Sequence, residues 1–140
     1  MRKEYHQLMK KDYCNRITPE YITSLKSNEI FVFGSNLAGM HGGGAARTAR
    51  FYFGAVMGNG DGPQGQSYAI PTMQGGVETI RPYIDKFIGY AKAHPEQTFL
   101  VTPIGCGIAG FTPDEIAPLF GEAVSVKNIH LPQSFWEKLV

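Results

Sequence analysis

Three consecutive glycines, Gly42 to Gly44, are the clearest candidate for chemistry in this chain. They lack a Cβ, so a phosphate group can approach the main chain and accept hydrogen bonds from its N–H groups. An apolar stretch, residues 30–33, precedes them, and helix-compatible residues begin at Ala45. A loop between a strand and a helix places N–H groups and the positive end of a helix dipole beside one pocket. The sequence therefore predicts that these glycines bind a ligand that carries phosphate. The alternative is that they only allow the chain to turn tightly.

A second glycine-rich segment, residues 103–111, follows another apolar stretch, residues 98–102. Strands that alternate with helices form a mostly parallel sheet, and ligands bind outside the carboxyl ends of its strands. Because both glycine-rich loops follow such ends, we expect them to line one cleft.

The elements around these loops follow from apolar spacing. Residues 77–93 place apolar side chains three and four positions apart, which is typical of an amphipathic helix. Residues 54–66 contain five glycines and predict a long loop. Strands are expected at 29–34, 67–72, 98–102 and 124–131. Helices are expected at 19–26, 45–53 and 77–93. A further helix should begin at the capping pattern that starts with Thr112, and a short last helix should begin at Gln133. The predicted fold class is α/β: a three-layer α/β/α sandwich with a mixed, mostly parallel central sheet, in one domain spanning 1–140.

The composition is that of an ordinary globular domain, with 43% hydrophobic residues, 18% charged residues and a net charge of +1. So small a net charge indicates no direct nucleic-acid or membrane surface. Cys14 and Cys106 lack the spacing of a metal or redox site, so neither a metal nor another cofactor is expected. No lysine stands in a P-loop frame, and the absence of signal-peptide and membrane-spanning patterns makes the cytoplasm the default compartment.

The first loop resembles that of the macrodomain family, α/β modules that bind ADP-ribose. The family's first motif is an Asn at the end of a strand, five intervening residues, three glycines and a small apolar residue. Asn36, Gly42 to Gly44 and Ala45 reproduce it, and His41 precedes the glycines as in many members.

The second loop also matches this family, whose second motif is a glycine, two residues, a glycine and an aromatic residue. Residues 107–111 match that motif, and a helix is expected directly after it. The resemblance covers residues 29–123 and is that of a short, divergent member. It implies a macrodomain-like fold.

The resemblance implies roles for individual residues. Asn36 would bind the distal ribose hydroxyls, and in a hydrolase it would orient a water against the anomeric carbon with help from His41. Phe111 would pack against a ribose. The other implied ligand-binding positions are Gly34, Ser35, Gly42, Gly43, Gly44, Ala45, Gly105, Cys106, Gly107, Ile108, Ala109 and Gly110. A diphosphate held by backbone amides needs no cluster of Arg or Lys.

Two departures from the family pattern concern acidic residues. Ala46 stands where hydrolytic members of one large branch carry an Asp, so this position supplies no group to activate water. The acid that usually selects the adenine amino group has no secure counterpart, and Asp12 is the nearest candidate. Binding of the diphosphate and ribose is therefore better supported than adenine selection or catalysis.

Two side chains near the glycines have a catalytic and a structural interpretation. His41 is either a general acid or base, since its ordinary pKa lies near neutrality, or a loop histidine that only packs. Cys106 is either a nucleophile whose pKa the surrounding N–H groups lower or a small residue that a tight loop tolerates, and we favour the second.

Three functions stay open. The leading hypothesis is a module that binds ADP-ribose or a derivative of it, with or without hydrolysis of ADP-ribosyl linkages. The second is a non-catalytic reader or adaptor domain. The third and most distant is a Rossmann-like nucleotide hydrolase, whose Thr and Glu the second loop lacks. The expected partner is ADP-ribose or a related small molecule, free or as a modification on a macromolecule.

Overall fold

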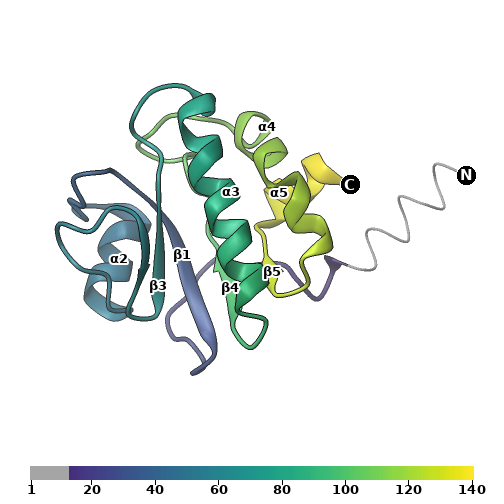
Figure 1. Ribbon diagram of the computed structural model, residues 1–140, viewed down its shortest axis with the longest axis horizontal. Helices are drawn as coiled ribbons and strands as arrows, with labels where there is room; N and C mark the ends of the chain where they lie inside the picture. The colour runs from purple at the N-terminus through teal and green to yellow at the C-terminus, as the bar shows by residue number, and fades with distance from the viewer. Residues whose placement is uncertain (1–12) are drawn as a thin grey trace, which may run out of the picture.

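The computed structural model describes residues 13–140 and contains one five-stranded sheet. The strand order is β2-β3-β1-β4-β5, and Figure 1 shows β1 between β3 and β4. β2 runs antiparallel to β3, and the other neighbouring pairs are parallel. The strands are β1 (Glu29–Ser35), β2 (Gly62–Gln64), β3 (Ser67–Pro71), β4 (Thr98–Val101) and β5 (Ile129–His130). The expected α/β class with a mixed, mostly parallel sheet is therefore confirmed.

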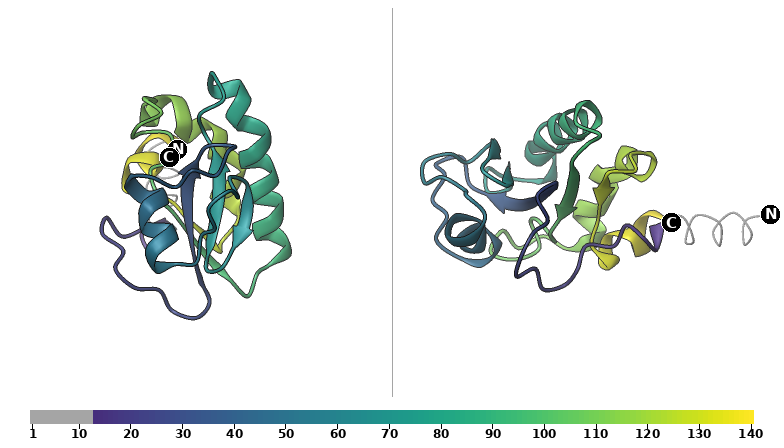
Figure 2. Two further views of the ribbon diagram at one scale, coloured as in Figure 1. Left: turned by 90° about the vertical axis from the view of Figure 1, so that its left-hand side faces the viewer. Right: turned by 90° about the horizontal axis from the view of Figure 1, so that it is seen from below.

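Helices lie on both faces of this sheet, with α2 and α3 on opposite sides (Figure 2). α5 packs against η1 and α4 near the β5 edge. The helical elements are α2 (Gly44–Tyr52), α3 (Val77–Ala93), α4 (Pro113–Ile116), the 3₁₀ helix η1 (Ala117–Ser125) and α5 (Gln133–Leu139). Within the described residues, no helix has the length and apolar character needed to cross a bilayer.

The alternation of side chains along β1 explains why both faces are covered. Phe31 and Phe33 belong to the small apolar cluster under α2, whereas Ile30 and Val32 belong to the large cluster that includes α3. All four side chains are buried, as expected for a central parallel strand. The central strand is thus packed on both faces, and the first glycine-rich loop begins at its carboxyl end.

Several predicted boundaries are confirmed by the structure. α3 spans Val77–Ala93 as its apolar spacing indicates, and α2 begins one residue before the expected position. α4 begins after Thr112, whose backbone N–H donates to the Glu115 carboxylate at 3.1 Å as part of a capping box. Residues 19–26 contradict the prediction because they form no helix. Ile22 and Leu25 pack against the cluster under α2 from an irregular chain, and an isolated helix of that length is too short to be stable without packing.

Two further expectations need correction. Residues 54–66 are not loop throughout, because β2 pairs with β3 there. The last strand is shorter than the predicted 124–131, since η1 continues to Ser125 and β5 contains only Ile129 and His130. An apolar run alone does not show where a helix ends and a strand begins.

Candidate ligand-binding site

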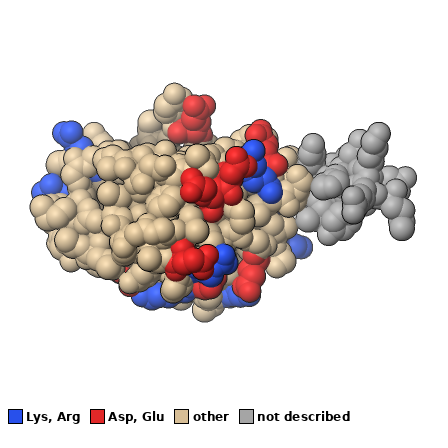
Figure 3. Space-filling view, turned by 90° about the horizontal axis from the view of Figure 1, so that it is seen from above, with Lys and Arg blue, Asp and Glu red and all other residues tan. Residues whose placement is uncertain are grey.

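A cavity of about 230 Å³ opens where the parallel strands end. Both glycine-rich loops line it, together with residues that follow β3 and β4. Its walls are formed by Gly34, Ser35, Asn36, Met40, Gly42, Gly43, Gly44, Ala45, Ala46, Thr72, Met73, Thr102, Pro103, Ile104, Gly105, Gly107, Ile108 and Ala109. Among residues 13–140, none with a charged side chain is in this lining. Figure 3 views the molecule from this end and shows a largely uncharged left-hand surface.

The two loops lie within van der Waals reach of each other. A Cβ placed on Gly43 would lie 3.7 Å from Cδ1 of Ile108, across the cavity. A Cβ placed on Gly34 would lie 3.4 Å from both the Gly105 nitrogen and the Thr72 hydroxyl oxygen. The cavity therefore has a floor of strand ends and two glycine-rich walls, one of which carries the Ile108 side chain.

Both glycine-rich loops contain backbone N–H groups without an intramolecular acceptor among the described residues. The first N–H groups of a helix have no partner within the helix, and Gly43 caps α2 without a side-chain hydrogen bond. In the second loop, the N–H groups of Gly107, Ile108 and Ala109 donate to no acceptor among the described residues. N–H groups without a partner can bind anions, especially at the positive end of a helix dipole.

Asn36 uses its side chain to close the loop that it begins. Its amide nitrogen donates to the Met40 carbonyl at 3.1 Å, and its amide oxygen accepts from the Met40 N–H at 2.9 Å. One N–H and one lone pair of the carboxamide remain for a ligand. Asn36 lines the cavity, so it can both shape the loop and contact what binds there.

The glycine-rich segment after α2 supports the Asn36 loop from behind. The N–H of Gly58 donates to the Gly39 carbonyl at 2.9 Å, and the Ser35 hydroxyl donates to the Gly60 carbonyl. A Cβ on Gly60 would overlap the Asn36 carbonyl oxygen, and Gly39 adopts a φ of 71°. Only glycines allow these two loops to approach so closely. Sequence reasoning left the role of residues 54–66 open, and this contact supplies it.

His41 lies outside the cavity lining. Its ring is 1% exposed, and neither ring nitrogen has a partner among the described residues. It packs edge-on against Phe33 with the ring centroids 5.2 Å apart. This position matches the structural interpretation of His41 and gives it no access to the cavity as a general acid or base.

Three other predicted positions also lie outside the cavity lining: Cys106, Gly110 and Phe111. Phe111 packs instead against the large apolar cluster. Burial, with a smaller contribution from Glu115, raises the pKa of the Cys106 thiol. A raised pKa is the opposite of what a nucleophilic thiolate needs. The structure thus supports the second interpretation of Cys106, a residue that fits a tight loop.

A larger cavity of about 590 Å³ adjoins the first and shares Ala45, Thr102 and Pro103 with it. Its other walls come from residues 18–23, from residues 132–134 and from Phe31 and Thr48. Glu20 is the one carboxylate that residues 13–140 contribute to its lining. Sequence reasoning missed this cavity because it assigned residues 19–26 to a helix.

Sequence reasoning also missed some walls of the smaller cavity. These residues are Met40, Ala46, Thr72, Met73, Thr102, Pro103 and Ile104. Their signal was positional, because each follows a strand end or flanks a predicted glycine loop. Asp12, the nearest candidate for adenine selection, lies outside the described residues.

Comparisons with protein-family models, curated proteins and solved structures found no match for this chain. Among residues 13–140, no three or more His, Cys, Asp or Glu side chains are grouped so that they could hold a metal ion. The site is therefore interpreted from its geometry alone.

Proposed function

We propose that this chain binds ADP-ribose or a derivative of it, as a short macrodomain-like module with a three-layer sandwich fold. One observation carries the proposal: among the described residues, two glycine-rich loops line one cavity without a charged side chain, and N–H groups of both loops have no acceptor. A diphosphate can bind there without a lysine or arginine, because N–H groups and a helix dipole stabilise its charge.

The cavity shapes suggest how such a ligand would lie. The diphosphate would occupy the smaller cavity, which both glycine-rich loops line, and the distal ribose would contact the free N–H and lone pair of Asn36. The adenosine end would enter the larger, more apolar cavity past Ala45. Glu20, which lines that cavity, would accept a hydrogen bond from the adenine amino group, a role for which the sequence offered only Asp12 as the nearest candidate.

Recognition is better supported than hydrolysis. Ala46 lines the cavity without a carboxylate, and His41 is buried behind the wall. Asn36 is the one predicted catalytic side chain that reaches the cavity.

Incubation with ADP-ribosylated protein or nucleic acid distinguishes a non-catalytic reader from a hydrolase. Tight binding without release supports a reader, and release that Asn36→Ala abolishes, while weakening binding less, supports a hydrolase.

Calorimetric titration with ADP-ribose, AMP and NAD tests the proposal. We expect ADP-ribose to bind most tightly and Gly43→Val to abolish its binding, because the new side chain would fill the space in front of Ile108. Gly43 has an extended φ of −157°, so valine fits its backbone. Gly89→Val on the exposed side of α3 is the matched control. Preference for AMP would favour a nucleotide hydrolase, and absence of binding would refute the proposal.

A further inference from the structure

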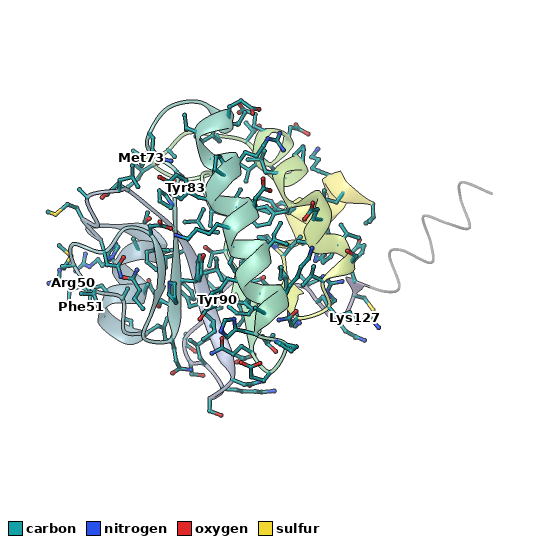
Figure 4. The ribbon with its side chains drawn as sticks, in the orientation of Figure 1. Arg50, Phe51, Met73, Tyr83, Tyr90 and Lys127 are labelled. Carbon is teal, nitrogen blue, oxygen red and sulfur yellow. The ribbon has the colours of Figure 1, made fainter. Side chains whose placement is uncertain are left out.

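We propose that the outer face of α2 binds single-stranded nucleic acid. This face is defined by Arg47, Arg50, Phe51 and Tyr52, all of which are exposed. Figure 4 labels Arg50 and Phe51 at the outer edge of the molecule. The proposal goes beyond recognition of ADP-ribose, and none of these four residues lines either cavity of the candidate site.

Two aromatic rings stand in water on this face. Phe51 is 58% exposed and Tyr52 is 76% exposed, and both help to line a hollow of about 470 Å³ with Arg47 and Thr48. Large apolar side chains exposed side by side on one helix indicate an interaction surface. Exposed rings provide flat surfaces on which bases can stack.

Two guanidinium groups accompany the rings. The guanidinium carbon of Arg47 lies 5.6 Å from the centroid of the Phe51 ring, and that of Arg50 lies 5.1 Å from it. α2 contains no acidic residue, and neither arginine forms an ion pair within residues 13–140. The left-hand rim of Figure 3, where α2 lies, correspondingly shows cationic side chains. The charge of this face complements an anionic partner, although the net charge of the whole chain is near zero.

The combination of groups favours nucleic acid over other anionic partners. Phosphates pair with guanidinium groups, and bases stack on aromatic rings and on guanidinium planes. An acidic peptide would use the two arginines but would leave the rings of Phe51 and Tyr52 without a role. A symmetric dimer through this face would bring the arginines of both copies into one interface, with no acidic residue on α2 to pair with them.

The position of this face relative to the candidate site is consistent with a shared role. Thr48 lines both the hollow on α2 and the larger cavity, and Ala45 lines both cavities. A bound strand would therefore lie directly beside the candidate site, and α2 would serve both.

Fluorescence anisotropy with a labelled single-stranded DNA of about 12 nucleotides tests the proposal without any ADP-ribose. We expect binding that weakens between about 50 mM and about 200 mM salt. Each of Arg47→Gln and Arg50→Gln should reduce the salt slope by about 0.7, and Tyr52→Ala should weaken binding about tenfold. Lys127→Gln is the charge control, since Figure 4 places Lys127 at the opposite end of the molecule from Arg50.

Other results would overturn the proposal that α2 binds single-stranded nucleic acid. Binding that none of the three variants weakens would overturn the proposal, as would equal competition by a polyglutamate peptide. A dimer that Tyr52→Ala dissociates, without DNA binding by the wild-type protein, would identify α2 as a self-association surface instead. The α2 variants should bind ADP-ribose with unchanged affinity in calorimetric titration. Loss of DNA binding by these variants can then be distinguished from loss of the proposed function.

Discussion

At the scale of single residues, polar side chains mostly shape backbone rather than project into the site. Asn36 closes its own loop, and Thr102 donates from its hydroxyl to the Val32 carbonyl at 2.8 Å. Arg16 donates to the carbonyls of Ala123, Val124, Val126 and Ile129 and lies over the Trp136 ring. Arg16 thereby joins the segment that forms a wall of the larger cavity to the end of η1. Ligand binding at the candidate site therefore depends on the backbone conformation that these side-chain hydrogen bonds stabilise.

Asn36→Asp tests this reading of one side chain. The carboxylate can still accept from the Met40 N–H, but it cannot donate to the Met40 carbonyl and adds negative charge beside the proposed diphosphate site. We expect ADP-ribose affinity to fall at least tenfold, which corresponds to about 1.4 kcal/mol. Asn15→Asp, on the exposed surface, should leave the affinity unchanged. Equal affinities for the wild type and Asn36→Asp in a calorimetric titration would exclude Asn36 from the site.

At the scale of elements, the close approach of two loops holds the site in shape. The segment between α2 and β2 packs behind the loop after β1 through Gly39, Gly58 and Gly60. Short strands and tight loops with glycine at the points of approach leave little freedom for Asn36 to move. The loop that lacked a predicted function is therefore part of the support for the site.

Gly60→Ala should disturb that support. The new methyl group would overlap the Asn36 carbonyl oxygen and lie 2.9 Å from the carbonyl carbon of Leu37, so the Asn36 loop must shift. We expect a loss of about 1–3 kcal/mol in the free energy of unfolding, measured with urea, and about a tenfold loss of ADP-ribose affinity at a temperature where the variant is folded. Gly121→Ala, which meets no neighbouring atom within 4 Å, is the control. An unchanged affinity in folded Gly60→Ala would show that the contact does not position the site.

At the scale of the whole molecule, we expect the sheet edge near β5 to make folding sensitive to acid, because the pKa of His130 is lowered there. Burial and, to a lesser extent, the charge of Arg16 lower the pKa of His130, against a smaller opposing effect of Glu29. Protonation of His130 therefore favours the unfolded chain, so its contribution to stability is present above the ordinary histidine pKa of about 6.5 and is lost as pH falls below it.

Urea denaturation at a series of pH values checks this prediction. The free energy of unfolding of the wild type should decrease as the pH falls from 7 through the ordinary histidine pKa, and His130→Gln should remove part of that decrease. His94→Gln serves as the control substitution. The same slope in the wild type and His130→Gln would assign the acid sensitivity to other groups.

The sequence predicted most of the fold because apolar periodicity and glycine positions report local structure directly. Residues 77–93 and the two glycine loops are examples. Segments held by distant contacts were not predictable in the same way: residues 19–26 carry a helix-start pattern, yet the packing of Ile22 and Leu25 determines their structure. His41 showed the same limit, since its sequence position left a catalytic and a structural role open, and only tertiary burial showed that it has no access to the cavity. Contacts between Gly60 and Asn36 join residues far apart in sequence, and no local signal reports them.

The central claim is that backbone N–H groups of two facing loops bind the diphosphate of ADP-ribose, and amide NMR spectroscopy tests it most directly. Titration of labelled protein with ADP-ribose should produce the largest amide shifts at Gly43, Gly44, Gly107, Ile108 and Ala109, and inorganic pyrophosphate should shift the same group more weakly. Shifts confined to other residues, or no shifts at saturating ADP-ribose, would contradict the proposal that these N–H groups bind the diphosphate.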